Sequence, residues 1–499
     1  MKTGEVILIG AGPGDPGLLT VAGREALLNA EVVVYDRLVG PAILAMMPEQ
    51  AEKINVGKRS SHHIVPQEQI NQILLEKALE GKRVVRLKGG DPFLFGRGGE
   101  ELELLAEHHI PFREIPGITS AISVPAYCGI PVTHRDFCSS LHIVTGHQRA
   151  GVPLSIPFRA LIETKATLVF LMGVTALPQI MKGLLENGMD PQMPAAVLEK
   201  GTTPNQRPIL STVSGLTQAA REAKVQSPAI IVVGKVCSLS PGFDWFDRLA
   251  LKGKKIIVTR PRDRAGTLAA RLRSLAADVT EFPCIETLPL DPCPALEEAL
   301  RQIDSYEWLA FTSPAGVTSL MDFLRKQGLD VRALGRIKLA AIGTGTDRAL
   351  GSFGLHADLI PEIFDGAHLG QALAAKKPRG KVLILRAQWG TEALTDALAA
   401  GGISYSDVRI YETRFTCPEA ETVKALLDPR DPPIVTFTSA STVKGFARAL
   451  GSFDPRSLIG ACIGEQTRAE AEKLGIPTIM AEKATMDALI DAVTDYVLK

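Results

Sequence analysis

Long apolar runs are missing from this sequence. None reaches the roughly 18 residues that a helix needs to cross a membrane, so we expect no membrane-spanning segment and no membrane partner. Residues 1–16 combine a short apolar run with a glycine-rich turn. We expect a first β-strand there and not a signal peptide, because no small-residue cleavage site follows the run.

Cysteine is scarce and scattered. The 7 cysteines form no CxxC pair and no spacing typical of zinc ligands. An odd, dispersed set of this kind predicts reduced thiols in the cytoplasm and no bound metal.

Neither sign of charge is in excess. Lys and Arg together number 55, Asp and Glu also number 55, and the formal net charge is zero. A balanced chain gives no indication of a nucleic-acid partner or of binding to a charged membrane. Any anionic ligand must therefore meet local clusters of basic side chains.

What the chain does contain is a regular alternation of β-branched apolar runs with helical patterns. This rhythm predicts an α/β fold with mostly parallel sheets, and a length of 499 residues predicts about three or four domains. The expected strands lie at 6–9, 32–35, 83–87, 141–145, 167–172 and 229–233.

Two breaks divide this pattern. Pro116 and Gly117 stand before a small-residue helix expected over 119–127, and we interpret them as a hinge between two lobes. A second break over 238–253 is followed by a fresh apolar strand. We therefore place the main domain boundary near residue 250.

The C-terminal half contains an internal repeat. Glu-Thr at 286–287 recurs at 412–413, and Phe-Thr-Ser at 311–313 recurs at 437–439, so both pairs share an offset of 126 residues. A period of this length corresponds to one domain and not to a solenoid unit. We expect two similar α/β lobes with a ligand cleft between them.

The densest motif is the glycine-rich stretch at 87–101. A Gly-Gly-Asp-Pro turn just after a strand is a typical ligand site in α/β proteins, although an ordinary loop remains the alternative. A second glycine turn at 10–16 invites comparison with a dinucleotide turn in which Asp36 would bind the ribose. Its glycines read GxGxG and not GxGxxG, and Pro13 removes an amide donor, so NAD is the weaker interpretation.

Residues 4–246 resemble the uroporphyrinogen-III C-methyltransferase family. The motifs that carry the resemblance are GAGPGDP (10–16), RLKGGDPFLFGRGGEE (86–101), PGITSA (116–121), GIPVTHRD (129–136) and SPAIIVVGKV (227–236). The resemblance implies a two-lobed tetrapyrrole methyltransferase over 1–248, with lobes 1–116 and 117–248 and a homodimer formed through this half. It would use S-adenosylmethionine (SAM), release S-adenosylhomocysteine and convert uroporphyrinogen III to precorrin-2, the branch point toward sirohaem and cobalamin.

The resemblance also assigns site residues. The implied SAM contacts are Pro13, Gly89, Gly90, Asp91, Leu94, Thr119, Ser120, Met172 and Gly201. Asp36 is the implied proton acceptor and Lys58 the implied proton donor, since methylation of a pyrrole carbon ends in loss of a proton. Taken alone, Asp36 could cap a turn, Lys58 could pair with a substrate carboxylate, and Met172 could pack in a core.

The implied substrate carries many carboxylates, for which we expect basic partners, although each of these residues could equally be a plain surface charge. The candidates are Arg37, Lys58, Arg59, Lys88, Arg97, His134 and Arg135.

The C-terminal half, 253–499, resembles uroporphyrinogen-III synthase. The matching segments include KIIVTRP (255–261), AAIGTGT (340–346), KVLILRA (381–387) and VTFTSASTV (435–443). The resemblance implies two lobes with parallel sheets, one from 253–284 plus 413–499 and the other, 285–412, inserted into it. The implied reaction cyclises hydroxymethylbilane to uroporphyrinogen III with loss of water.

Tyr411 is the implied catalytic side chain of this half, donating to the leaving hydroxyl. We expect it at the end of a strand over 408–410 with its ring toward the cleft, although a structural aromatic at the lobe junction is the alternative. The Phe-Thr-Ser segments could equally cap helices. The candidate cleft residues are Arg260, Thr312, Ser313, Thr344, Thr438 and Ser439.

The whole chain is therefore predicted to be a bifunctional enzyme that first cyclises the bilane and then methylates the product twice. The alternative keeps the methyltransferase and treats the C-terminal half as a non-catalytic two-lobed ligand-binding module.

Overall fold

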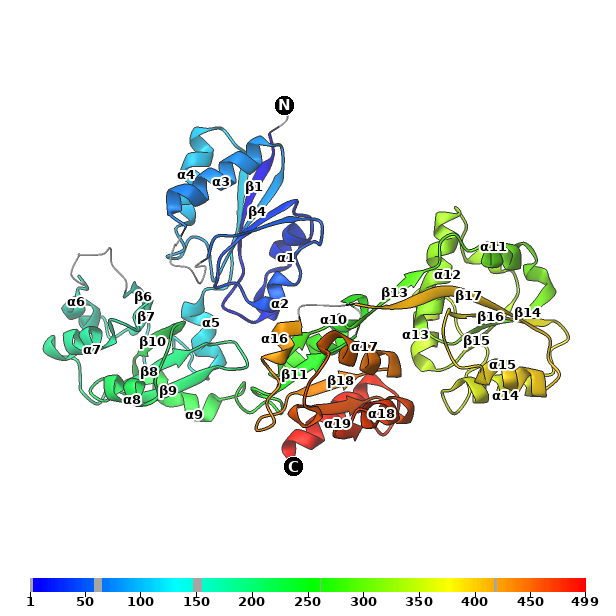
Figure 1. The fold of residues 1–499 in the computed structure, drawn as a ribbon. Helices are drawn as coiled ribbons and strands as arrows, with labels where there is room; N and C mark the ends of the chain where they lie inside the picture. Colours follow the sequence, from blue (N-terminus) through cyan, green and yellow to red (C-terminus); the bar gives the residue numbers. More distant parts are fainter. Residues whose placement is uncertain (1–2, 58–64, 147–154, 261, 417–419) are drawn as a thin grey trace. The chain divides into compact units, whose positions relative to one another are not determined.

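The computed structural model describes residues 3–57, 65–146, 155–260, 262–416 and 420–499, with the backbone alone for 262–266. The chain forms two compact units, Met1–Gly253 and Lys254–Lys499 (Figure 1). Each unit contains two five-stranded sheets. Among the helices in these ranges, none is both long and apolar enough to cross a membrane.

The first sheet of the N-terminal unit is parallel throughout, in the order β3-β2-β4-β1-β5. Helices α3 and α4 pack on one face and α1 and α2 on the other, which is why β1 and β2 are continuous apolar runs. The elements are β1 (Glu5–Gly10), η1 (Pro16–Leu18), α1 (Val21–Leu28), β2 (Val32–Tyr35), α2 (Pro41–Leu44), β3 (Glu52–Asn55), α3 (Gln67–Leu79), β4 (Arg83–Lys88), α4 (Gly98–Glu107) and β5 (Phe112–Ile115).

The second sheet of this unit departs from the parallel prediction. Its order is β6-β7-β10-β8-β9, and only β6 and β7 run parallel. A short turn without a crossover helix joins β8 to β9, and such a connection permits only antiparallel pairing. The elements are α5 (Ser120–Tyr127), β6 (Leu141–Thr145), α6 (Phe158–Glu163), β7 (Thr167–Leu171), α7 (Leu177–Glu186), β8 (Pro194–Glu199), β9 (Arg207–Thr212), α8 (Leu216–Glu222), β10 (Ala229–Val233), η2 (Lys235–Leu239) and α9 (Ser240–Phe243).

The C-terminal unit begins with a sheet that is parallel throughout, in the order β12-β11-β18-β19-β20. Its strands come from both ends of the unit's sequence. Its core contains Ile257, Phe437 and Phe446. The elements are β11 (Lys255–Val258), α10 (Arg262–Ser274), β12 (Asp278–Glu281), α16 (Ala420–Lys424), β18 (Ile434–Phe437), α17 (Ala440–Leu450), η5 (Pro455–Ser457), β19 (Ile459–Cys462), α18 (Glu465–Glu472), β20 (Thr478–Met480) and α19 (Met486–Leu498).

The other sheet of this unit lies between these two stretches in sequence, in the order β13-β17-β16-β14-β15. It is parallel except at one edge, where β13 and β17 are antiparallel. The elements are β13 (Ile285–Pro289), α11 (Pro294–Arg301), η3 (Ile303–Ser305), β14 (Tyr306–Phe311), α12 (Pro314–Lys326), η4 (Val331–Leu334), β15 (Lys338–Ala341), α13 (Thr344–Gly351), α14 (Gly366–Ala375), β16 (Lys381–Ala387), α15 (Ala393–Ala400) and β17 (Tyr405–Phe415).

The internal repeat has a structural counterpart in this antiparallel edge. Thr287 of β13 pairs directly with Thr413 of β17, so the two Glu-Thr copies lie opposite each other. The chain leaves the first sheet of this unit through β13 and returns to it after β17, as Figure 1 shows.

Candidate active sites

Loops from four strands meet at the carboxyl edge of the first parallel sheet. They follow β1, β2, β4 and β5, and parallel strands deliver their carboxyl ends to one edge. The loops after β1 and β4 are paired directly, because Gly12 N donates to Gly90 O (3.1 Å) and Gly90 N donates to Gly12 O (2.7 Å). The two glycine-rich motifs therefore form one surface.

Close contact between these loops depends on glycine. A Cβ on Gly117 would overlap the carbonyl oxygen of Gly90 and would lie 2.6 Å from Gly10 Cα. Gly90 has φ +70°, and no described atom lies within 4 Å of the position that a Cβ there would take. The open side of Gly90 lets a ligand approach the backbone closely, which fits a SAM contact at Gly89 and Gly90.

The Asp91 carboxylate holds this loop in place. Its Oδ1 accepts from Phe93 N (2.9 Å) and Leu94 N (3.0 Å), and its Oδ2 accepts from Gly117 N (3.1 Å). Both oxygens are thus engaged by backbone amides. Asp91 thus fixes the shape of the glycine loop and ties it to the hinge after β5.

Hydrogen bonds join the loop after β1 to the second lobe. Asp15 Oδ2 accepts from Tyr127 Oη (2.9 Å), and Asp15 N donates to Thr202 Oγ1 (3.3 Å). A Cβ on Gly201 would overlap the side chain of Val124 on α5. The following predicted SAM residues lie on the segments that meet at this junction: Pro13, Thr119, Ser120 and Gly201.

Met172 is not a core residue. It follows β7, its side chain is 49% exposed, and its φ is +55°. Residues other than glycine rarely adopt this left-handed backbone conformation, and such strained positions cluster at functional sites. Core packing is therefore the wrong interpretation of Met172. Other non-glycine residues with positive φ in these loops are Phe95, Arg97, Lys200 and Thr202.

The predicted basic residues differ in exposure and in the partners that they already have. Arg37 and Arg135 are exposed, and Arg97 is half-exposed with its guanidinium on Glu100 Oε2 (2.6 Å). His134 Nδ1 accepts from Asp136 N (3.2 Å). Lys58 and Arg59 lie outside the described residues; Gly57, the residue before them, packs against Arg37.

Apolar side chains are exposed beside these basic groups. Phe93 and Phe95 belong to the glycine-rich loop, and Leu38 follows Asp36 and Arg37; all three are exposed. A Cβ on Gly89 would lie 2.5 Å from Leu38 Cβ, so Leu38 lies against that loop. The carboxyl edge of the sheet thus presents apolar and cationic groups together.

Lys88 does not belong to this exposed surface. It is buried, and its Nζ lies 2.7 Å from Glu101 Oε1. Arg86, two residues earlier on β4, donates from Nε to the same oxygen (3.2 Å), and its Nη2 lies 3.7 Å from Asp36 Oδ2. The expectation that Lys88 binds substrate carboxylates is therefore wrong. Arg86 and Glu101 stand in the glycine-rich motif, but the sequence pattern did not indicate a role for either.

Asp36 combines two roles in this geometry. Its Oδ1 accepts from Leu38 N (2.9 Å), so it does cap a turn, while its Oδ2 faces Arg86. The side chain keeps 25% exposure. Asp36 therefore links the buried charges to the surface of the site.

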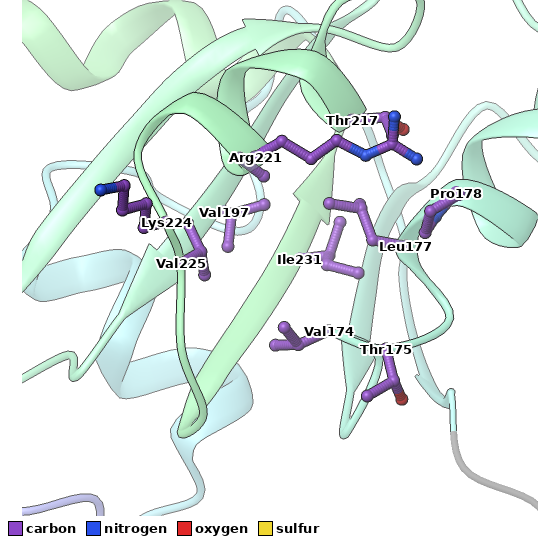
Figure 2. Close-up of a pocket in the computed structure, with 11 residues that line it drawn as sticks. Val174, Thr175, Leu177, Pro178, Val197, Thr217, Arg221, Lys224, Val225 and Ile231 are labelled. Carbon is purple, nitrogen blue, oxygen red and sulfur yellow. The ribbon is translucent and has the colours of Figure 1, made fainter.

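A separate cavity of about 370 Å³ lies in the second lobe, between α7, α8, β8 and β10. Figure 2 shows its apolar lining, which includes Val197, Leu177 and Ile231, with Arg221 and Lys224 at the side of α8. None of the predicted SAM or tetrapyrrole residues lines it. The cavity is therefore not the predicted site.

In the C-terminal unit, the serines of both Phe-Thr-Ser segments are helix N-caps. Ser313 Oγ accepts from Gly316 N at the start of α12, and Ser439 Oγ accepts from Thr442 N at the start of α17. The N-cap interpretation is thus confirmed for both serines. Thr312 and Thr438 precede them at the ends of β14 and β18 and are partly buried.

The other cleft candidates also stand at or near the carboxyl ends of strands. Thr344 is the exposed first residue of α13, after β15. Arg260 follows β11, and its Nη1 lies 3.2 Å from the sulfur of Met486. The sequence pattern missed Arg386, which is buried near the end of β16 and pairs with Asp407 (2.7 Å).

Tyr411 is placed differently from the prediction. It lies within β17, not at its end, and its side chain is in the core of the inserted sheet, with the residue only 6% exposed. Its hydroxyl is 2.7 Å from Ser313 Oγ. The strand continues to Phe415 because β13 pairs with it beyond Tyr411, and the ring belongs to the core cluster that includes Phe311 of β14 and Ala315 of α12.

Comparison with known proteins separates the two halves. A family model described as Tetrapyrrole (Corrin/Porphyrin) Methylases matches residues 5–217, and one described as Uroporphyrinogen-III synthase HemD matches residues 266–491. The protein named Porphyrin biosynthesis protein HemD from Ruminiclostridium josui is 49% identical over 492 residues, which cover 98% of each chain. The chain belongs to the tetrapyrrole methylase and uroporphyrinogen-III synthase families.

The expected fusion of a methyltransferase with a uroporphyrinogen-III synthase is thus confirmed, and with it a place in tetrapyrrole biosynthesis. The Uroporphyrinogen-III C-methyltransferase of Bacillus subtilis (strain 168) is 41% identical over 336 residues, covering 67% of this chain and 68% of its own. A solved structure of the Uroporphyrin-III C-methyl transferase from Thermus thermophilus, complexed with S-adenyl homocysteine, is 40% identical and covers 47% of this chain and 99% of that chain, with a TM-score of 0.41.

Proposed function

We propose that this chain catalyses two consecutive steps of tetrapyrrole biosynthesis. Residues 253–499 cyclise hydroxymethylbilane to uroporphyrinogen III. Residues 1–248, in a folded unit that extends to Gly253, methylate this product twice with SAM to give precorrin-2, for sirohaem or cobalamin. Membership of both families supports the pairing, because the product of one reaction is the substrate of the other.

The observation that carries the methyltransferase assignment is the pairing of Gly12 with Gly90 beside exposed apolar and cationic side chains. Leu38, Phe93 and Phe95 offer apolar surface to the macrocycle. Arg37 and Arg97 offer guanidinium groups to its carboxylates, together with His134, Arg135 and Arg59.

SAM is a sulfonium cation with an amino-acid tail and an adenosine, and the proposed site has groups for each part. Gly89, Gly90 and Gly201 give close access to backbone. Thr119 and Ser120 offer a hydroxyl and amides at the start of α5. Further contacts are proposed from Pro13, Leu94 and Met172, while Asp91 supports the loop.

When bound, SAM supplies a methyl group and its sulfur keeps the electron pair of the broken bond, giving S-adenosylhomocysteine. The new carbon–carbon bond uses π electrons of a pyrrole, so a proton must then leave the macrocycle. Asp36 accepts this proton through its partly exposed carboxylate. Lys58 acts as proton donor or as a partner of a substrate carboxylate.

The cyclisation requires positioning more than acid–base power. The C–O bond of the hydroxymethyl carbon breaks, and Tyr411 donates a proton so that the oxygen leaves as water. A carbon–carbon bond closes the ring through a spiro intermediate that inverts ring D, and a proton lost from the macrocycle restores Tyr411. The Tyr411–Ser313 pair holds this hydroxyl in one place.

Carboxylate recognition in the synthase half rests on groups at the ends of parallel strands. Helices α12, α13, α17 and α18 begin there, and unpaired amides at helix starts attract anions. The side chains proposed to add hydroxyl or guanidinium contacts are Arg260, Thr312, Ser313, Thr344, Thr438 and Ser439.

The wider expectations stay predictions. We propose a cytoplasmic homodimer, formed through the methyltransferase half, with no nucleic-acid or membrane partner. Within the described ranges no group of three His, Cys, Asp or Glu side chains is arranged to hold a metal ion. We propose that neither reaction uses one.

The test is incubation of the whole chain with hydroxymethylbilane under anaerobic conditions, with and without SAM. We expect uroporphyrinogen III without SAM and precorrin-2 with it. A chain that methylates supplied uroporphyrinogen III but leaves the bilane to close into the uninverted isomer I would instead support the non-catalytic C-terminal module. Absence of methylated product from supplied uroporphyrinogen III would refute the methyltransferase assignment.

A further inference from the structure

Two cations lie inside the first lobe, on one face of β4. Residues two apart on a strand share a face, and Val84, Arg86 and Lys88 follow one another on the side covered by α3 and α4. Arg86 is 3% exposed and Lys88 5%. Buried cations are unfavourable unless they are paired, so these two require a buried anionic partner.

Their partner is Glu101 on α4, which is fully buried. Its Oε1 accepts from Lys88 Nζ (2.7 Å), from Arg86 Nε (3.2 Å) and from the neutral Gln67 Nε2 (3.2 Å). Its Oε2 is also buried and has no hydrogen-bond partner among the described residues. One carboxylate oxygen therefore orients both cations.

Of the two buried cations, only Arg86 also lies at ion-pair distance from Asp36, a residue of the proposed site. Its Nη1 donates to Val34 O (3.4 Å) and Leu87 O (3.2 Å), which fixes the plane of the guanidinium. Its Nη2 lies 3.7 Å from Asp36 Oδ2. Because Glu101 engages Nε and the two carbonyl oxygens engage Nη1, Nη2 is the nitrogen left to face Asp36.

Lys88 has a different position in the same cluster. Burial, and after it the charge of Arg86, lower the pKa of Lys88. Its ammonium donates to Glu101 Oε1 (2.7 Å), and Asp36 influences it less than Glu101 does. Arg86 is therefore the buried cation of this cluster that lies at ion-pair distance from Asp36.

We propose that Arg86 is a positioning residue for methyl transfer: fixed by Glu101, it holds the Asp36 carboxylate in the orientation in which it accepts the proton. This inference rests on the proposed role of Asp36 as proton acceptor. Leu38 N donates to Asp36 Oδ1 and Arg86 lies beside Asp36 Oδ2, so each carboxylate oxygen is positioned by a different group.

Arg86→Met and Lys88→Met form a matched pair of variants. Each removes one buried cation and leaves the other paired with Glu101. Arg86→Met also removes the donor to Val34 O and Leu87 O, so the thermal unfolding midpoint is measured for both variants. Only Arg86→Met removes the group beside Asp36. We expect it to lower kcat about ten- to a hundredfold, because Asp36 is no longer held in place, while KM for uroporphyrinogen III changes little.

We expect Lys88→Met to lower kcat much less. Arg83→Met, which replaces an exposed arginine of the same strand that pairs with Glu5, should keep the wild-type kcat. SAM affinity, measured by calorimetric titration, should change little in all three variants. Equal losses of kcat in Arg86→Met and Lys88→Met, or no loss in either, would overturn the proposal.

A double-mutant cycle tests whether Arg86 acts through Asp36. We expect Asp36→Asn to slow single-turnover methylation strongly and Arg86→Met to cause no further loss in that background. Additive losses would mean that Arg86 works independently of Asp36. Full activity of Asp36→Asn would instead refute the proton-acceptor role itself, so failure of the inference and failure of the underlying assignment give different results.

Discussion

The hydroxyl of Tyr411 lies 2.7 Å from the hydroxyl of Ser313, and Ser313 also caps α12 through Gly316 N. The implied catalytic phenol of the synthase half is therefore attached to the start of a helix, not free on a strand end. A helix start carries a partial positive charge, which would help a nearby phenol to release its proton toward a departing hydroxyl. The Tyr411 side chain is thus buried, and its hydroxyl is directed at the hydroxyl of Ser313.

Tyr411→Phe should slow cyclisation about ten- to a hundredfold. One hydrogen bond to a group that develops charge is worth on the order of 1.5–3 kcal/mol. The variant should also release more uroporphyrinogen I, the product of uncatalysed closure, while binding of a bilane analogue stays intact. The measurement is the cyclisation rate together with the isomer ratio of the product.

Tyr306→Phe is the matched control for this variant. Tyr306 Oη donates to Ser406 Oγ at 3.0 Å in the same sheet, so both substitutions remove a tyrosine–serine hydrogen bond. We expect similar small losses of stability but a normal rate for Tyr306→Phe. Equal rates in the two variants would mean that Tyr411 is structural and that catalysis here is essentially positioning.

Asp91→Ala should weaken SAM binding without unfolding the first unit. The substitution removes the acceptor for three backbone amides, those of Phe93, Leu94 and Gly117, and each lost bond contributes about 1 kcal/mol. Because the whole loop relaxes, we expect at least a tenfold rise in the dissociation constant, measured by titration with SAM.

Asp190→Ala provides the comparison for Asp91. Asp190 Oδ1 accepts from Gln192 N at 2.8 Å in an exposed turn of the second lobe, so it loses the same kind of bond away from the glycine loop. The SAM affinity of the Asp190→Ala variant should equal that of the wild type. An unchanged affinity in Asp91→Ala would contradict the assignment of this loop to SAM.

The sequence pattern could predict much of the fold because buried parallel strands are continuous apolar runs. The expected strand at 32–35 coincides with β2, and those at 141–145 and 229–233 coincide with β6 and β10. It missed β3 (EKIN) and β5 (FREI). Both are edge strands of the first sheet, and their polar and apolar residues show little alternation. It also missed the antiparallel pairings in the second sheet, because strand direction depends on the connections and not on composition.

The site could be predicted only where backbone chemistry requires particular residues. Glycine is needed where Gly10, Gly90 and Gly117 touch, and that need is visible as a motif. The pair of Asp15 with Tyr127 joins positions 112 apart in sequence and leaves no local pattern. Arg86 was visible only as a charge within an apolar strand, which a sequence alone does not connect to Glu101.

Gly117→Ala should be strongly destabilising. The added methyl would overlap Gly90 O and crowd Gly10 Cα, and the contacting atoms are backbone, which cannot move aside as a side chain can. Overpacking of this kind costs about 1–3 kcal/mol or more. Thermal unfolding should show a lower midpoint, and SAM affinity should fall with it. Gly99→Ala, where no described atom lies within 4 Å of a Cβ, should unfold like the wild type.

The extent of the first folded unit gives a last prediction. Residues 249–253 pack on that unit: Leu251 is fully buried, and Lys252 Nζ bonds Gln206 O (3.0 Å) and Asp247 Oδ1 (3.0 Å). A fragment ending at 248 loses the Leu251 side chain, whose burial is worth about 1.5–3 kcal/mol, and the anchoring of Gln206. We therefore expect fragment 1–253 to unfold at clearly higher denaturant concentration than fragment 1–248, and to methylate supplied uroporphyrinogen III at the rate of the whole chain. Fragment 254–499 should cyclise the bilane by itself. Equal midpoints for the two N-terminal fragments would show that these last residues contribute nothing to the fold, and an insoluble C-terminal fragment would argue that the two halves depend on each other.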